Sequence, residues 1–267
     1  MKKKFQISNL VLIIFLIYAF CNNAQTKADS FRVINNNAFK MGENLTFKIK
    51  YGFVTAGISK MYVKDEKTIS GRLVNHVIFE VNSVPSFDWI YKVRDRYETF
   101  IDKEGLFPWR FEQHIREGGY KRDYSAYFDQ RQNKAFTSEG IFDIPEYVND
   151  IISAFYLARI FDYTNSKEND EIHLKNFSNG KTFDLDVVFR GREEIEVPAG
   201  KFSCIIIEPL VKGGGLFKSE GSIYIWLSDD SLKVPIKVKS KIVVGSIDAV
   251  LSEYSGLAGE FKAKIPE

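Results

Sequence analysis

Apolar and polar residues alternate along most of the chain after residue 40. In the clearest run, Leu45, Phe47, Ile49 and Tyr51 are separated by single polar residues. A period of two predicts a β-strand with one buried and one solvated face. Further runs of this kind cover residues 73–81, 109–115, 120–128, 172–177, 183–189, 202–208, 223–227 and 234–251.

Turn signals separate neighbouring runs. Gly118-Gly119 lies between the runs at 109–115 and 120–128, and Ser178-Asn179-Gly180 lies between the next two. Short loops of this composition join antiparallel strands in hairpins. Consecutive hairpins build an antiparallel meander. We therefore expect an all-β, mainly antiparallel fold, either a strongly curved sheet or an open β-barrel.

One segment departs from the period of two. Asp143-Ile-Pro145-Glu146 has the acidic first turn and early proline of a helix start, and Val148, Ile151, Ile152 and Phe155 then recur at a spacing near 3.6 residues. This spacing predicts one amphipathic helix over residues 145–161. Because the helix is apolar around much of its circumference, we expect it to pack against the concave side of the sheet.

The N-terminus predicts export. Three lysines follow Met1, and residues 10–20 form an apolar run that is too short to cross a bilayer. This arrangement is typical of a signal peptide, here 1–24, with cleavage after Ala24. Two alternatives remain, an uncleaved anchor and a lipoprotein signal that uses Cys21, although Phe20 stands where a small residue is expected.

Removal of residues 1–24 changes the charge. The whole chain of 267 residues carries a formal net charge of +2. The mature chain would keep 34 Lys and Arg against 35 Asp and Glu. This balance gives no electrostatic reason to expect nucleic acid as a partner. It also leaves Cys204 without a disulfide partner, in an apolar run that predicts a buried thiol. We expect a lead-in at 25–40 and a single β domain at 41–267.

The sequence offers little catalytic chemistry. Its three histidines stand apart in strand patterns, and no known nucleophile, phosphate-binding or metal-ligand motif is present. We therefore predict no catalytic residues, no metal and no cofactor. Adjacent acids such as Glu193-Glu194 and Asp229-Asp230 suit turns and solvated faces. The alternative is a glycosidase-like pair of carboxylates in a surface cleft.

Two other features are candidates for binding. Lys233, Lys237, Lys239 and Lys241 occupy alternate positions of one predicted strand. They form either a solvated or aggregation-resistant face or a contact for an anionic surface. Aromatic residues are also abundant, at 15% of the chain. They form either a large core or the lining of an apolar pocket, for which the candidate ligand contacts are Trp89, Trp109, Phe111 and Tyr124.

Several segments in order resemble the DUF3108 family of exported bacterial proteins, whose function is unassigned. They are residues 42–57, 150–159, 196–202, 225–230 and 235–237. The resemblance spans about residues 40–254, implies a periplasmic location, and supplies no catalytic residues to transfer. By architecture alone, the predicted meander with an internal helix is similar to LolA/LolB-like open barrels, which hold a lipid chain in an apolar hollow.

These observations favour a non-catalytic, exported cell-envelope protein that binds an apolar or amphipathic ligand, such as a lipid or a lipoprotein chain. A second hypothesis is a structural or assembly partner that engages other envelope proteins through sheet edges or the lysines. A third is a glycan-acting enzyme that uses Asp or Glu. The hypotheses differ in what lies under the helix, since only the first requires an apolar cavity there.

Overall fold

The computed structural model describes residues 31–212, 222–241 and 245–266. The predicted signal peptide at 1–24 and Cys21 lie outside these residues. By its internal contacts the chain divides after Arg32, and the unit from Val33 onward holds every strand and helix described below. Within the described residues, no helix combines the length and the apolar character needed to span a membrane.

One antiparallel sheet of fifteen strands dominates this unit, and it is not closed into a barrel. Fourteen strands follow one another in the order β8-β7-β6-β5-β4-β3-β2-β1-β14-β13-β12-β11-β10-β9, and β15 pairs with β11. The strands are β1 (Asn44–Tyr51), β2 (Val54–Ile69), β3 (Arg72–Ser83), β4 (Arg94–Asp102), β5 (Pro108–Glu117), β6 (Tyr120–Asp129), β7 (Lys134–Thr137), β8 (Gly140–Asp143), β9 (Glu171–Ser178), β10 (Lys181–Val197), β11 (Gly200–Lys212), β12 (Ile223–Ser228), β13 (Pro235–Lys241), β14 (Ser246–Ser255) and β15 (Lys264–Ile265). The predicted fold class is confirmed.

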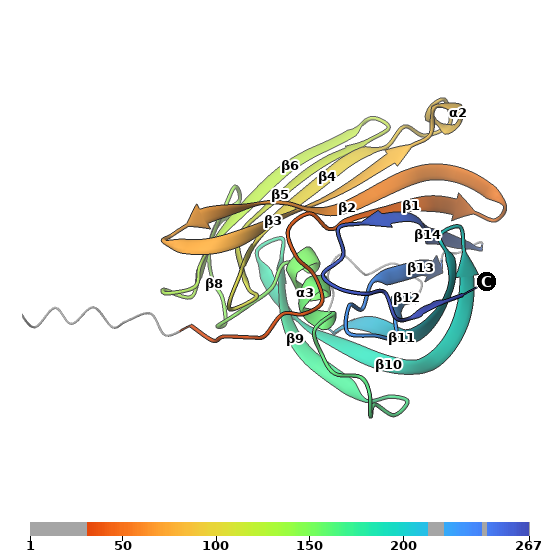
Figure 1. Ribbon diagram of the computed structural model, residues 1–267. Coiled ribbons are helices and arrows are strands. Elements are labelled where there is room, and N and C mark those ends of the chain that lie inside the picture. The colour runs from red at the N-terminus through yellow and green to blue at the C-terminus, as the bar shows by residue number, and fades with distance from the viewer. Residues whose placement is uncertain (1–30, 213–221, 242–244, 267) are drawn as a thin grey trace, which may run out of the picture. The chain divides into compact units, whose positions relative to one another are not determined.

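The hairpins predicted from turn residues are also present. β5 and β6 pair around Gly118-Gly119, and β9 and β10 pair around Asn179-Gly180. The central pair, in contrast, joins distant segments, because β1 lies between β2 and β14. The two halves of the sheet, β1–β8 and β9–β14, therefore meet along β1 and β14, and helix α3 (Ile151–Ala158) lies between them (Figure 1).

Helix α3 is shorter than predicted. Its N-cap is Asp150, whose carboxylate accepts hydrogen bonds from the backbone N–H groups of Ile152 and Ser153. Tyr147 has a left-handed backbone, which no continuous helix through that residue would allow. The prediction of a helix start near Pro145 is therefore wrong, since the acidic cap lies five residues later. A four-residue helix, α2 (Pro85–Asp88), connects β3 to β4.

The segment between β8 and α3 joins the two outer edges of the sheet. Asn149 makes two backbone hydrogen bonds with β9, donating to Lys175 and accepting from Phe177. The ring of Phe142, from β8, also contacts the ring of Phe177 at a centroid distance of 5.9 Å. These contacts bring the edge strands together without a continuous ladder between them.

The lead-in to the first strand belongs to the folded unit. Ala38 and Phe39 are buried, and the ring of Phe39 packs edge-on against Tyr156 of α3. Ile34 adds a backbone hydrogen bond to Glu104. The part of the predicted 25–40 lead-in from Val33 onward is thus tied to the same core as the sheet and the helix.

Candidate functional site

An apolar cavity lies between α3 and the inner face of the sheet. Its volume is about 420 Å³, which falls within the range of small-molecule sites. Both halves of the sheet and the helix contribute side chains to it. The lining residues are Phe47, Ser59, Met61, Phe79, Val81, Tyr97, Gln113, Ile151, Ile152, Ala154, Phe155, Ala158, Leu185, Val187, Ile207, Pro209, Ile223, Ile225, Pro235, Val238 and Ala249.

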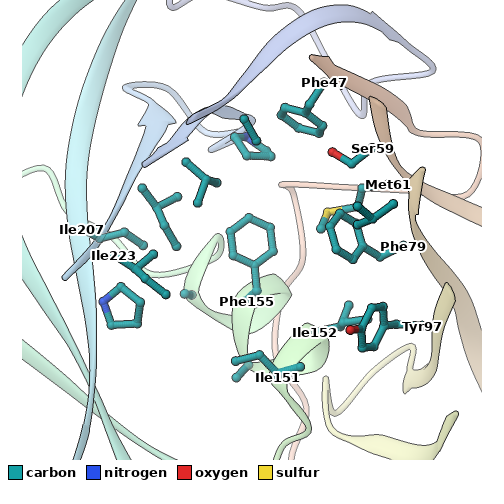
Figure 2. A pocket seen from close by; sticks show the side chains of 18 of the residues that line it. Phe47, Ser59, Met61, Phe79, Tyr97, Ile151, Ile152, Phe155, Ile207 and Ile223 are labelled. Carbon is teal, nitrogen blue, oxygen red and sulfur yellow. The ribbon is translucent and has the colours of Figure 1, made fainter. Parts of the chain in front are cut away.

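Phe155 projects from α3 into the middle of this space (Figure 2). Met61 and Phe79 face it from β2 and β3, and Ile207 and Ile223 face it from the opposite half of the sheet. Strand alternation explains the arrangement, because successive side chains point to opposite faces of a sheet. Where β2, β3, β10, β11 and β12 contribute two residues each, these residues are two positions apart.

The lining contains three polar side chains and no charged one. Ser59 is almost completely buried, and its hydroxyl makes no side-chain hydrogen bond within the described residues. Tyr97 and Gln113 are cross-strand partners on β4 and β5. Burial raises the pKa of Tyr97, so this phenol stays protonated at neutral pH. The site therefore offers hydrogen-bonding groups in an uncharged, apolar enclosure.

The cavity is placed toward one end of the sheet. At that end lie the β1–β2 turn, the β3–β4 connection with α2, the β5–β6 turn and the start of β14, which together we call the loop end. Val81 and Ala249 line the cavity close to where their strands meet the loop end. At the other end of the sheet, the C-terminus of α3 is fixed by Arg159, which is hydrogen-bonded to Leu232 and Lys233 ahead of β13.

The aromatic residues chosen from the sequence do not line this cavity. Trp109, Phe111 and Tyr124 are buried in the packed core, where the indole N–H of Trp109 donates to Asp102 at 3.0 Å. Trp89 lies on the surface, 82% exposed, just after α2. Selecting residues by local aromatic density thus grouped three core residues with one surface residue.

The four lysines chosen from the sequence do not all lie on one face of a strand. Lys237, Lys239 and Lys241 share the outer face of β13, where the ammonium of Lys237 is 3.0 Å from Asp248. Lys233 precedes the strand, is nearly buried, and donates to the carbonyl of Asp230. The prediction of a four-lysine stripe is therefore wrong at Lys233, which belongs to the turn before β13.

Each histidine contacts a carboxylate that sequence spacing did not indicate. His76 is buried between Asp65 and Glu98 and stacks on the ring of Phe100. His114 contacts Asp123, and His173 contacts Asp186, each at 2.7 Å.

Two groups of these residues are close enough to share a cation. One comprises Glu98, Glu112 and His114, and the other comprises Glu171, His173 and Asp186. In the first group, Arg96 and Arg110 already form ion pairs with the two glutamates. Glu98, Glu112 and His114 are each adjacent in their strands to Tyr97 or Gln113 of the lining, and Asp186 lies between the lining residues Leu185 and Val187, so these side chains face away from the cavity.

The acids of the proposed glycosidase-like pair have structural partners. Asp229 pairs with Arg192 at 2.9 Å, and Asp230 accepts hydrogen bonds from Ser228 and from the backbone of Leu232 and Ala263. They border a second, polar pocket that lies on the other side of Arg159. No carboxylate is among the residues that line the apolar cavity.

Comparison with solved structures finds a β-barrel-like protein of similar fold and further matches at lower TM-scores. A β-barrel-like protein of the DUF1849 domain from Brucella abortus aligns with a TM-score of 0.53 at 10% identity, covering 82% of this chain and 99% of its own. A candidate exported protein with a YmcC-like fold from Bacteroides fragilis has a TM-score of 0.39 at 11% identity, covering 85% and 100%. A candidate lipoprotein from Parabacteroides distasonis has 0.34 at 13% identity, with the same coverage.

These identities are too low to transfer more than the fold, and the chain matches no curated protein significantly. The family model for proteins of unknown function DUF3108 matches residues 46–252. This match contains most of β1 and of β14, together with β2, α3 and the lining of the cavity. The protein belongs to the DUF3108 family.

Proposed function

We propose that this protein is an exported envelope protein that binds the apolar chain of a lipid or a lipoprotein in the cavity beneath α3. The observation that carries the proposal is the cavity itself, about 420 Å³ lined almost entirely by hydrocarbon. An engineered apolar cavity of roughly 150 Å³ already binds benzene. A space nearly three times larger suits an alkyl chain.

The driving force is the transfer of methylene groups out of water, worth about 0.8 kcal/mol for each buried CH₂. The lining has no charged group whose desolvation would oppose this transfer. Ser59, Tyr97 and Gln113 would hydrogen-bond a polar junction such as an ester. The ligand class expected is therefore amphipathic, with one or more hydrocarbon chains.

Export is supported by the predicted signal peptide at 1–24, and it would place the protein where membrane lipids and acylated proteins are available. The assembly-partner hypothesis is compatible with the exposed lysines but does not explain an apolar cavity. The enzyme hypothesis requires a cleft with paired carboxylates. Asp229 and Asp230 do border the polar pocket, but Asp229 is paired with Arg192, and Asp230 is hydrogen-bonded to Ser228 and to the backbone of Leu232. Lipid binding therefore remains our proposal.

The test is to purify the protein from its own envelope and identify bound lipid by native mass spectrometry and by organic extraction. Ala249→Trp places an indole in the cavity from β14, so this variant should lose most of the bound lipid. Ser125→Trp makes a similar change in size at an exposed position of β6 and should retain the lipid.

Circular dichroism and thermal unfolding must show both variants folded before their lipid content is compared. Lipid that is absent from the wild-type protein, or present equally in both variants, would contradict binding in this cavity. An Ala249→Trp variant that folds and loses lipid while Ser125→Trp keeps it would support the proposal.

A further inference from the structure

Large apolar side chains are exposed together at the loop end. Among the described residues, thirteen large hydrophobic side chains are exposed, and eight of them lie at this end. They are Tyr51, Phe53, Val54, Trp89, Ile90, Tyr91, Tyr120 and Ile247. Phe53 is fully exposed at the tip of the β1–β2 turn, and Trp89 is 82% exposed after α2. Exposed apolar groups gathered in one region mark an interaction surface.

Hydrogen bonds and register show that these turns are neighbours. Ile247 pairs with Tyr51, the last residue of β1, and Tyr51 pairs with Val54 across the turn. The β3–β4 connection joins β2 through a bond from Val84 to Ala56. It joins the β5–β6 turn through a bond from Gly118 to Lys92. The eight side chains thus lie along one continuous edge of the sheet. Helix α2 and the β1–β2 turn project from this edge (Figure 1).

The same end carries unpaired positive charge. Lys50, Lys92, Lys121, Lys239 and Lys241 make no salt bridge with any described residue. Two of the nearby carboxylates are paired, Asp88 with Arg94 at 2.6 Å and Asp248 with Lys237 at 3.0 Å. Glu117 is half-buried beside Asp95. Aromatic and aliphatic groups flanked by lysines match the chemistry of an anionic membrane interface.

We propose that the loop end docks on the surface of an anionic phospholipid bilayer. Phe53, Trp89 and Ile90 enter the interfacial region, and the lysines contact the headgroups. The cavity lies toward the loop end of the sheet, so docking would turn it toward the bilayer. This last step rests on the proposed lipid binding and names the bilayer as the source of the ligand.

Trp89 provides a direct reporter of docking. The chain has three tryptophans, and Trp109 and Trp226 are buried. Vesicles of phosphatidylethanolamine and phosphatidylglycerol should therefore shift the emission of the protein to shorter wavelength through Trp89, and brominated lipid chains should quench it. Phosphatidylcholine vesicles should produce a much smaller shift, and added salt should reduce binding.

Variants tested by vesicle flotation distinguish docking through the loop end from nonspecific hydrophobic association with the bilayer. Phe53→Ser with Ile90→Ser keeps the reporter and should weaken partitioning at least tenfold. The matched control, Leu73→Ser with Ile141→Ser, removes two exposed apolar side chains elsewhere and should bind as the wild type does. Lys92→Gln and Lys241→Gln should each weaken binding about fivefold.

Failure of the wild-type protein to bind vesicles, or equal loss in both double variants, would overturn the docking proposal and favour a protein partner for this surface. Docking and lipid binding fail separately. The Ala249→Trp variant should still bind vesicles, because its change lies inside the cavity. If the wild-type protein binds vesicles but never contains lipid, only the proposed function is contradicted. If it contains lipid but does not bind vesicles, only the docking proposal is contradicted.

Discussion

The guanidinium of Arg159 binds both carboxylate oxygens of Glu43, at 2.7 and 2.8 Å, and neither side chain has any contact with solvent. Arg159 ends α3, and Glu43 precedes β1. The remaining N–H groups of Arg159 donate to the carbonyls of Ala38, Leu232 and Lys233. This one side chain therefore links the helix, the lead-in and the turn before β13.

Breaking this ion pair should destabilise the fold strongly. Glu43→Gln leaves the Arg159 charge buried without a counter-ion, which typically costs about 3–5 kcal/mol. Urea unfolding monitored by circular dichroism would measure the change in unfolding free energy. Arg192→Met removes the partly exposed partner of Asp229 and should cost no more than about 1 kcal/mol. Equal effects of the two substitutions would show that the Glu43 pair has no special role.

Acid should weaken the fold through Asp102. Burial alone would raise the pKa of this carboxyl, but hydrogen bonds from Arg72, Trp109 and Gly105 outweigh it and hold the pKa below the ordinary 3.8. A lowered folded-state pKa stabilises the protein above pH 3.8, and this stabilisation is lost as the pH falls below it. Asp102→Asn should cost about 1.5–3 kcal/mol at neutral pH.

The difference between Asp102→Asn and the wild type should therefore shrink as urea titrations are repeated from pH 6 toward pH 3. A constant difference across that range would mean that the charge of Asp102 does not contribute.

Asp150 should show the opposite pH dependence. Complete burial raises its pKa above 3.8, despite hydrogen bonds from Thr99, Ser153 and Ile152. A raised folded-state pKa of an acid means that stability falls as the pH rises through the interval from 3.8 to the folded value. Asp150→Asn keeps an oxygen to cap α3 and an amide to face Thr99, so its stability relative to the wild type should increase with pH.

Parallel urea titrations at pH 3 and pH 7 would test this expectation. Asp150→Ala serves as the control, because it also removes the cap and should cost about 1–2 kcal/mol at pH 3. Since this variant lacks the titrating carboxyl too, its cost should fall toward pH 7 in parallel with that of Asp150→Asn. An Asn variant that is less stable than the wild type at pH 7 would show that the carboxylate is the preferred form.

Cys204 should be unreactive in the folded protein. It is completely buried, and burial together with nearby acids raises the pKa of its thiol to about 12. Thiolate is the reactive form, so it is nearly absent at pH 8. With Cys21 replaced by serine, a thiol reagent should label Cys204 only as fast as the protein unfolds. Rapid labelling without urea would show that this part of β11 opens readily.

The period of two predicted strands well where the inner face is apolar. β1, β5 and β6 follow it closely, since residues such as Phe47 and Phe111 point inward and charged residues point outward. The same period gave no clear signal for β2 and β4. Their inner positions include Ser59 and Thr99, and both are buried although polar. Burial of polar residues depends on partners in other strands, which a local pattern does not contain.

The cavity could not be predicted from local aromatic density for a similar reason. Its lining takes one or two residues from each of many strands in addition to those from α3, and most are aliphatic. Trp109 and Trp89 stand close in sequence to cavity-lining strands, yet one fills the core and the other reaches solvent. The sequence pattern indicates which residues of each strand face inward. It does not indicate that β1 pairs with β14, and this pairing decides which inward-facing residues lie opposite one another.

That pairing also has a consequence for the time at which the fold forms. β1 and β14 are about 200 residues apart in the chain, yet they are neighbours at the centre of the sheet. Closing so long a loop carries a large entropic cost before any contact rewards it, so folding should be slow and should finish with this seam. Until β14 arrives, β1 lacks half of its hydrogen bonds, and the enclosure around α3 is incomplete. The core around α3 is thus incomplete until nearly the last strand of the chain has been synthesised.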